Sequence, residues 1–205
     1  MRDPTHLYTG EPSPRSYRAA RIVSDMCQPP ILGVLSFVML STLCGSAADI
    51  AVCMAVSILF SVVIPMSIIV FFARKFGNSD MDVVRREDRA MPLMIGTAAY
   101  AVGTGVLFLM DVPRIIWVLM LCYSVVTFSV YIISKWWKIS VHAVGCIGPS
   151  MGLIFAFGWP GALLLLVYPL VCWSRYVLKK HTPAQLVCGG ILGFVLTGLL
   201  FLILL

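Results

Sequence analysis

Long apolar runs fill most of this chain, and short polar stretches separate them. There are seven such runs, and all but one approach the roughly 20 residues that a helix needs to cross a bilayer. Their ranges are 31–47, 50–72, 92–110, 115–134, 139–157, 162–173 and 184–205. Because the run 162–173 is short for a full span, the pattern predicts an all-α polytopic membrane protein, a bundle of about six to seven transmembrane helices. We expect Ala48–Asp49 to form the turn between the first two spans and Pro65 to kink the second.

The first 28 residues differ from the rest because they are polar and rich in proline and arginine. They carry too little apolar surface to offset the entropy of ordering them. We therefore expect a mobile or surface-lying arm over residues 1–28, followed by a single transmembrane helical domain over residues 29–205. Within the arm, Tyr17–Met26 is compatible with a short interfacial helix.

Composition supports a membrane protein over a soluble one: the chain is 60% hydrophobic and 12% charged, with a mean hydropathy of +0.97. With seven spans, every Lys and Arg except Arg114 falls on the side of the N-terminus. The positive-inside rule then predicts a multi-pass protein with its N-terminus and this basic face in the cytoplasm. Because the cations flank the spans, anionic lipid or phosphate explains the net charge of +6 better than nucleic acid does.

Candidate chemistry concentrates in Ser174–Gln185, where ionisable side chains interrupt two apolar runs. Such groups are costly near a membrane unless they have a function. Arg175 offers a planar fork that matches phosphate oxygens, and a second basic cluster in the longest polar loop offers the same group. That cluster consists of Arg85, Arg86 and Arg89.

Two histidines, His142 and His181, each stand at the start of an apolar helix on the same face as the arginines. Imidazole is well suited to move protons or attack phosphorus near neutral pH. No thiolate or convergent carboxylate pair accompanies them, so the pattern favours phosphoryl transfer through a phosphohistidine, with no metal and no cofactor. One imidazole attacks, the other protonates the leaving oxygen, and the arginines offset the charge on phosphate.

These residues also form three ordered motifs. Ser174-Arg175, His181 and Gln185 match the pattern Ser-Arg-x5-His-x3-Asp, with glutamine at the aspartate position. Ser140 and His142 keep two positions of Pro-Ser-Gly-His. The pattern Lys-x6-Arg-Pro is represented by Arg89 and Pro92, with Arg85 or Arg86 in place of the lysine. Over roughly residues 73–195 the chain resembles the type 2 phosphatidic acid phosphatase superfamily, the membrane lipid phosphatases.

The resemblance implies a role for each matched position. His181 is the implied nucleophile and His142 the implied general acid. The implied phosphate contacts are Arg175, Arg89, Ser140 and Ser174. In the family the aspartate orients the attacking histidine, and here Gln185 can accept a hydrogen bond from one ring nitrogen but brings no negative charge.

We therefore expect a membrane lipid phosphate phosphatase that hydrolyses a phosphomonoester or diphosphate on a lipid or polyprenyl substrate, whose tail lies between spans. A non-catalytic lipid-binding or assembly subunit of the same fold is an alternative that Gln185 favours. A magnesium-dependent membrane prenyltransferase is another, suggested by the aspartates at Asp80, Asp82 and Asp88. Magnesium dependence separates the prenyltransferase from the phosphatase, and the effect of His181→Ala separates the phosphatase from the non-catalytic subunit.

Overall fold

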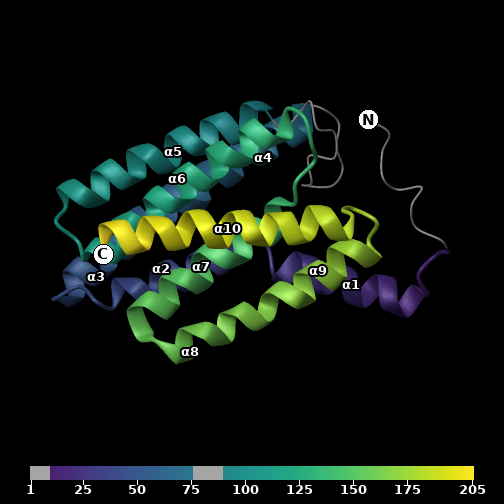
Figure 1. Ribbon diagram of the computed structural model, residues 1–205. Coiled ribbons are helices and arrows are strands. Elements are labelled where there is room, and N and C mark those ends of the chain that lie inside the picture. Colours follow the sequence, from purple (N-terminus) through teal and green to yellow (C-terminus); the bar gives the residue numbers. More distant parts are fainter. Residues whose placement is uncertain (1–9, 76–89) are drawn as a thin grey trace.

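The computed structural model describes residues 10–75 and 90–205, and every regular element within these ranges is helical. The helices form one elongated bundle in which the C-terminus lies at the end where α3 begins (Figure 1). In chain order the main helices are α1 (Pro14–Met26), α2 (Pro29–Ser41), α3 (Ala47–Ile58), α4 (Ile64–Lys75), α5 (Ala90–Leu109), α6 (Arg114–Ser134), α7 (Val141–Phe157), α8 (Trp159–Ala162), α9 (Val167–Val177) and α10 (Pro183–Leu204). The all-helical class predicted from the sequence is confirmed for these residues.

Part of the polar N-terminal arm is a helix. The Ser13 hydroxyl accepts a hydrogen bond from the Ser16 backbone N–H, and Pro14 occupies the first helical position, where proline is well tolerated. The resulting helix, α1, packs against α9 and buries Ala20 and Ser24. The expected helix over Tyr17–Met26 is therefore present, and it begins earlier, at Pro14. Because α1 packs against α9, this part of the arm belongs to the helical domain.

The first expected span is shorter than predicted. Helix α2 ends at Ser41, and α3 begins after a capping box in which Ser46 and Asp49 satisfy each other's backbone N–H groups. The turn therefore lies before Ala47, and our placement of it at Ala48–Asp49 was wrong. Local capping chemistry overrode the apolar run, because free N–H groups at a helix start need acceptors.

A change of helix type interrupts the second expected span beside Pro65. A π-helical turn over Leu59–Val63 separates α3 from α4, and Pro65 follows directly. Proline has no backbone N–H, and its ring clashes with the carbonyl four residues earlier, at Ser61. The wider π turn accommodates that clash within an otherwise continuous helical rod.

The packing of α10 against α7 depends on small residues. A Cβ placed on Gly189 would lie 3.0 Å from the Ser140 carbonyl oxygen, and one on Gly193 would lie 3.0 Å from that of Val144. The two glycines thus allow the backbone of α10 to approach α7. Glycines four residues apart on one helix commonly have this packing role.

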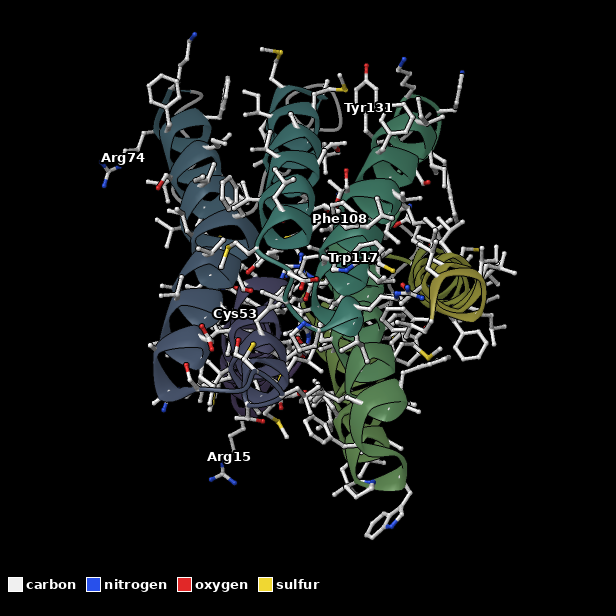
Figure 2. All side chains as sticks on the ribbon, turned by 90° about the vertical axis from the view of Figure 1, so that its left-hand side faces the viewer. Arg15, Cys53, Arg74, Phe108, Trp117 and Tyr131 are labelled. Carbon is white, nitrogen blue, oxygen red and sulfur yellow. The ribbon has the colours of Figure 1, made fainter. Side chains whose placement is uncertain are left out.

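Within residues 10–75 and 90–205, five helical rods are long and apolar enough to cross a membrane, and the α1–α2 pair, bent by 42°, could make a sixth. Helix α7 is apolar but has only 17 residues. The expected sixth span runs on to Val177 and is long enough, through the short helix α8, a 3₁₀ turn and α9. Many apolar side chains face outward, including Leu202 and Ile203 on α10, whereas Arg15 and Arg74 project from the periphery (Figure 2). These features are compatible with a multi-pass membrane protein.

Candidate functional site

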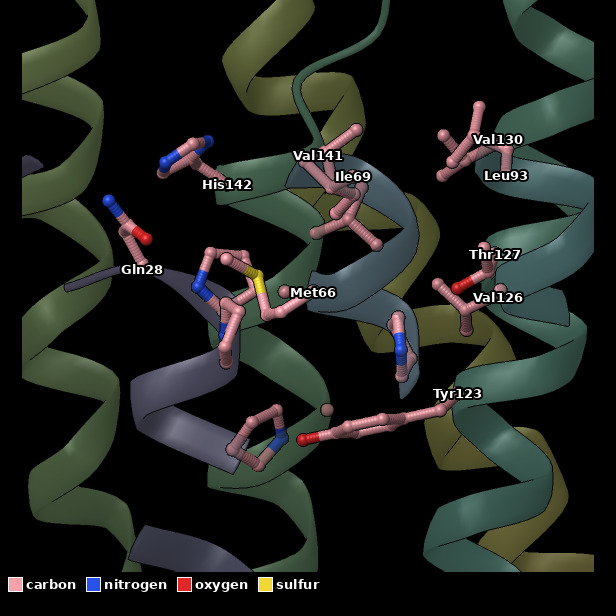
Figure 3. A pocket seen from close by; sticks show the side chains of 18 of the residues that line it. Gln28, Met66, Ile69, Leu93, Tyr123, Val126, Thr127, Val130, Val141 and His142 are labelled. Carbon is pink, nitrogen blue, oxygen red and sulfur yellow. The ribbon is translucent and has the colours of Figure 1, made fainter. Parts of the chain in front are cut away.

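A pocket of about 510 Å³ lies within the bundle and is lined by residues from α1, α2, α4, α5, α6, α7, α9 and α10. Its volume falls within the range of about 300–1,000 Å³ that is typical of sites for small ligands. Figure 3 shows His142 and Gln28 on one side of this pocket, and Leu93, Val126 and Val130 on the other. The pocket therefore combines a polar flank with an apolar one.

The structure brings both helix-start histidines and the motif arginine to this pocket. His142 is the second residue of α7, Arg175 lies near the end of α9, and His181 precedes the first turn of α10. All three line the pocket, together with Lys180. Chain segments more than 30 residues apart thus supply two imidazoles and a guanidinium to one cavity, as the motif spacing led us to expect.

The hydrogen bonds around His181 define its tautomer. Its Nδ1 lies 3.1 Å from Oε1 of Gln185, and the same oxygen accepts a hydrogen bond of 3.2 Å from the Thr182 backbone N–H. A backbone N–H can only donate, so the side-chain atom that faces it must be the amide oxygen. Nδ1 of His181 must then be the donor, which leaves Nε2 as the nitrogen with the lone pair in the neutral ring.

Gln185 itself is held by the start of its helix. Its backbone N–H donates to Oγ1 of Thr182 at 3.3 Å, which completes a capping box. His181 and Gln185 are only 2% and 4% exposed, so water competes little for their hydrogen bond. The sequence predicted that Gln185 could accept from a ring nitrogen, and this contact is present.

Arg175 is a buried cation held by the N-terminal helix. Its side chain is 3% exposed, and Nη1 donates a hydrogen bond of 3.0 Å to Oγ of Ser24 on α1. The neighbouring Ser174 hydroxyl donates to the Ala20 carbonyl oxygen, also at 3.0 Å. Two consecutive residues of α9 therefore attach to two successive turns of α1, so that α1 forms part of the wall of the pocket.

Two serines that were expected to contact phosphate have other partners here. Ser140 caps α7 by accepting the Ala143 backbone N–H, and Ser174 binds α1 as described above. Both are completely buried, and neither is among the described residues that line the pocket. In this structure their hydroxyls serve as a helix cap and a helix–helix contact.

The second basic cluster lies in a part of the chain that the structure does not describe. Arg85, Arg86 and Arg89 lie in the stretch 76–89, outside the described residues, as do the aspartates Asp80, Asp82 and Asp88. Within the described ranges, no group of three or more His, Cys, Asp or Glu side chains is arranged to hold a metal ion. The prenyltransferase alternative thus depends on residues outside those ranges.

The charge of the described pocket lining favours anions. Three cationic side chains, Arg21, Arg175 and Lys180, line it alongside a single carboxylate, Asp25, which forms an ion pair with Arg21. His142 also lies in the first turn of α7, where the helix dipole presents its positive end. A phosphate group entering this pocket would meet complementary charge.

No protein-family model, curated protein or solved structure matches the chain. The support for the phosphatase resemblance comes from the motif residues and from the placement of His142, Arg175 and His181 in one pocket.

Helix α1 and Lys180 contribute to the pocket, although neither was predicted as part of the site. Arg21, Ser24 and Asp25 all line the pocket, although the N-terminal arm was expected to be mobile or surface-lying. The signal was present in the sequence as a capping serine followed by proline, and as the four-residue spacing of Arg21 and Asp25. What the sequence could not supply was the surface on which this helix docks.

Proposed function

We propose that the protein is a membrane lipid phosphate phosphatase that works through a phosphohistidine at His181. The observation that carries the proposal is the convergence of His142, Arg175 and His181 on one pocket with an apolar flank. The cationic lining suits a phosphate headgroup, and apolar residues such as Met66 and Ile69 suit a hydrocarbon chain.

In the proposed reaction Nε2 of His181 attacks phosphorus, and the bond from phosphorus to the leaving oxygen breaks. His142 donates a proton to that oxygen, which releases the lipid alcohol. Water then attacks the phosphohistidine, the phosphorus–nitrogen bond breaks, and His142 takes up a proton from the water. Arg175 offsets the negative charge on the phosphoryl oxygens in both steps.

The Gln185 contact supports this assignment of roles. A donor at Nδ1 keeps the lone pair on Nε2, which is the state that a nucleophilic imidazole requires. The same contact also favours the second candidate, a non-catalytic lipid-binding subunit. A neutral amide stabilises the cationic ring less than the aspartate of the resembled family, and loss of the analogous carboxylate in serine hydrolases costs about 10⁴ in kcat.

The deciding experiment is phosphate release by the purified protein from a panel of lipid phosphates, with His181→Ala and His142→Ala measured alongside. We expect His181→Ala to abolish release and His142→Ala to lower it by about 10²–10⁴-fold, the usual contribution of general acid–base catalysis. The third histidine of the chain, His6, provides the matched control, and His6→Ala should release phosphate at the normal rate. Unchanged release by His181→Ala would exclude His181 as the nucleophile.

A further inference from the structure

A second pocket, of about 670 Å³, lies between α1 and the end of α9, and we call it the α1–α9 pocket. The two helices pack side by side at the end of the bundle away from the C-terminus (Figure 1). Its described lining comes from residues 11–22 and from residues 177–179. Arg21 and Leu178 also line the pocket that holds the two histidines, so the two pockets are neighbours.

The charge of the α1–α9 pocket favours an anion. Arg18, Arg21 and Lys179 supply three cations, and Glu11 is the single carboxylate among the described lining residues. Arg21 forms an ion pair with Asp25, which does not line this pocket. The excess of positive charge therefore raises the local concentration of anions.

Apolar side chains stand beside these cations. Tyr17 and Ile22 are 48% and 53% exposed, and Val177 lines the pocket from the end of α9. A free phosphate ion would make no use of such surface, whereas a phospholipid combines an anionic headgroup with hydrocarbon. Helices that carry basic and apolar side chains together are typical binders of membranes with anionic lipids.

The backbone at Lys179 is unusual for a lysine. Its φ is 55°, in the left-handed region, and the following residue closes the end of α9 with a 3.0 Å hydrogen bond from the Lys180 N–H to the Arg175 carbonyl oxygen. Glycine is the common residue where a helix ends in this way, because it has no Cβ. A lysine at this position is more strained than glycine, and it adds a cation to the α1–α9 pocket.

We propose that the α1–α9 pocket binds an anionic phospholipid of the surrounding membrane, with the headgroup phosphate between Arg18 and Lys179. The hydrocarbon of the lipid covers Tyr17 and Ile22. Because the lipid contacts α1 and the end of α9 together, it stabilises their packing. It therefore acts as an activator that does not itself react.

The activation follows from what α1 contributes to the candidate site. The packing of α1 on α9 carries the hydrogen bond from Arg175 to Ser24 and the one from Ser174 to the Ala20 carbonyl oxygen. A lipid that holds α1 in place thus keeps the guanidinium of Arg175 at the wall of the neighbouring pocket. This effect on phosphate release rests on the proposed function, whereas the lipid site itself does not.

The test titrates phosphatidylglycerol into the full-length protein in detergent and counts the lipids retained by native mass spectrometry, with phosphatidylcholine as the neutral lipid. Phosphatidylglycerol is a phosphodiester, so a phosphomonoesterase does not consume it. The pocket variants are Arg18→Gln and Lys179→Gly. Arg15→Gln is the matched control, because Arg15 is an exposed arginine of the same helix that does not line the α1–α9 pocket.

We expect each pocket variant to weaken phosphatidylglycerol binding by about fivefold, the usual contribution of one basic residue at an anionic membrane surface. Arg15→Gln should bind like the wild type. Lys179→Gly removes the charge and also relieves the positive φ, so its melting temperature should not fall and weaker binding cannot be due to misfolding. In nanodiscs, phosphatidylglycerol should raise phosphate release by the wild type more than by Arg18→Gln.

Equal affinity for the two lipids, or unchanged binding in both pocket variants, would overturn the lipid site. Displacement of the lipid by an equal concentration of inorganic phosphate would also overturn it, because the pocket would then be a site for free anions. Phosphatidylglycerol binding that depends on Arg18 and Lys179 in a protein that releases no phosphate would support the lipid site and reject the phosphatase activity.

Discussion

Replacing Ser24 by alanine tests whether the N-terminal helix positions the buried guanidinium of Arg175. The substitution removes the acceptor of the 3.0 Å hydrogen bond from Nη1 of Arg175 and leaves the rest of α1 unchanged. Both side chains are only 3% exposed, so water does not readily replace the lost oxygen. The guanidinium then loses its hydrogen bond to α1.

The size of the effect follows from the type of bond. A hydrogen bond to a charged group contributes about 1.5–3 kcal/mol, which corresponds to roughly a tenfold to hundredfold change in an equilibrium or rate constant. If Arg175 binds phosphate, Ser24→Ala should therefore lower kcat/KM for a lipid phosphate by a factor in that range. The affinity for inorganic phosphate, measured by competition, should fall in the same direction.

Two further variants separate positioning from a general loss of stability. Ser24→Thr keeps an oxygen at the same place and should restore most of the activity. Ser16→Ala changes a serine of the same helix that does not line the pocket and should have no effect. A Ser24→Ala protein with a lower melting temperature but unchanged kcat/KM and phosphate affinity would refute the positioning role.

Three more predictions concern the site and the bundle. Gln185→Asp should preserve or raise phosphate release because a carboxylate stabilises the cationic ring of His181. Gln185→Leu should lower release because it removes the acceptor of Nδ1. Equal rates of release by the two variants would contradict this role of Gln185. Gly193→Ala should lower the melting temperature in detergent because its Cβ would lie 3.0 Å from the Val144 carbonyl oxygen. The loss of stability should be equivalent to about 1–3 kcal/mol. Gly198→Ala is the control, because its Cβ would meet only Met151 Cε at 3.5 Å, and it should unfold like the wild type. A chelator of divalent cations should leave phosphate release unchanged, and a loss that added magnesium restores would favour the prenyltransferase alternative.

Much of the helical architecture could be predicted from the sequence because its signals are local. The expected spans over 115–134 and 184–205 differ by only one residue at their ends from α6 and α10. The errors arose where a cap or a docked helix overrode the apolar pattern. The Ser46 capping box moved the first turn, and packing on α9 ordered α1.

The candidate site was predictable only in part. The spacing of His142, Arg175 and His181 suggested one shared pocket, and all three line it. The serines of the same motifs were expected there as well, but Ser140 and Ser174 are used within the fold. Residue type and spacing identify a candidate site residue. Whether its side chain points into the pocket or bonds to a neighbouring helix depends on how the helices pack.

The sequence by itself determined that the chain is helical, where most of the helices lie and which polar residues stand at the ends of the helices. These features depend on periodicity, on the length of apolar runs and on caps, all of which act over a few residues. The tertiary structure alone decided which face of each helix lines the pocket. Helix α10 is apolar on every side, so no polar stripe marks the face that carries Thr197. Contacts between helices distant along the chain fix that face, and they also place Ser24 against Arg175.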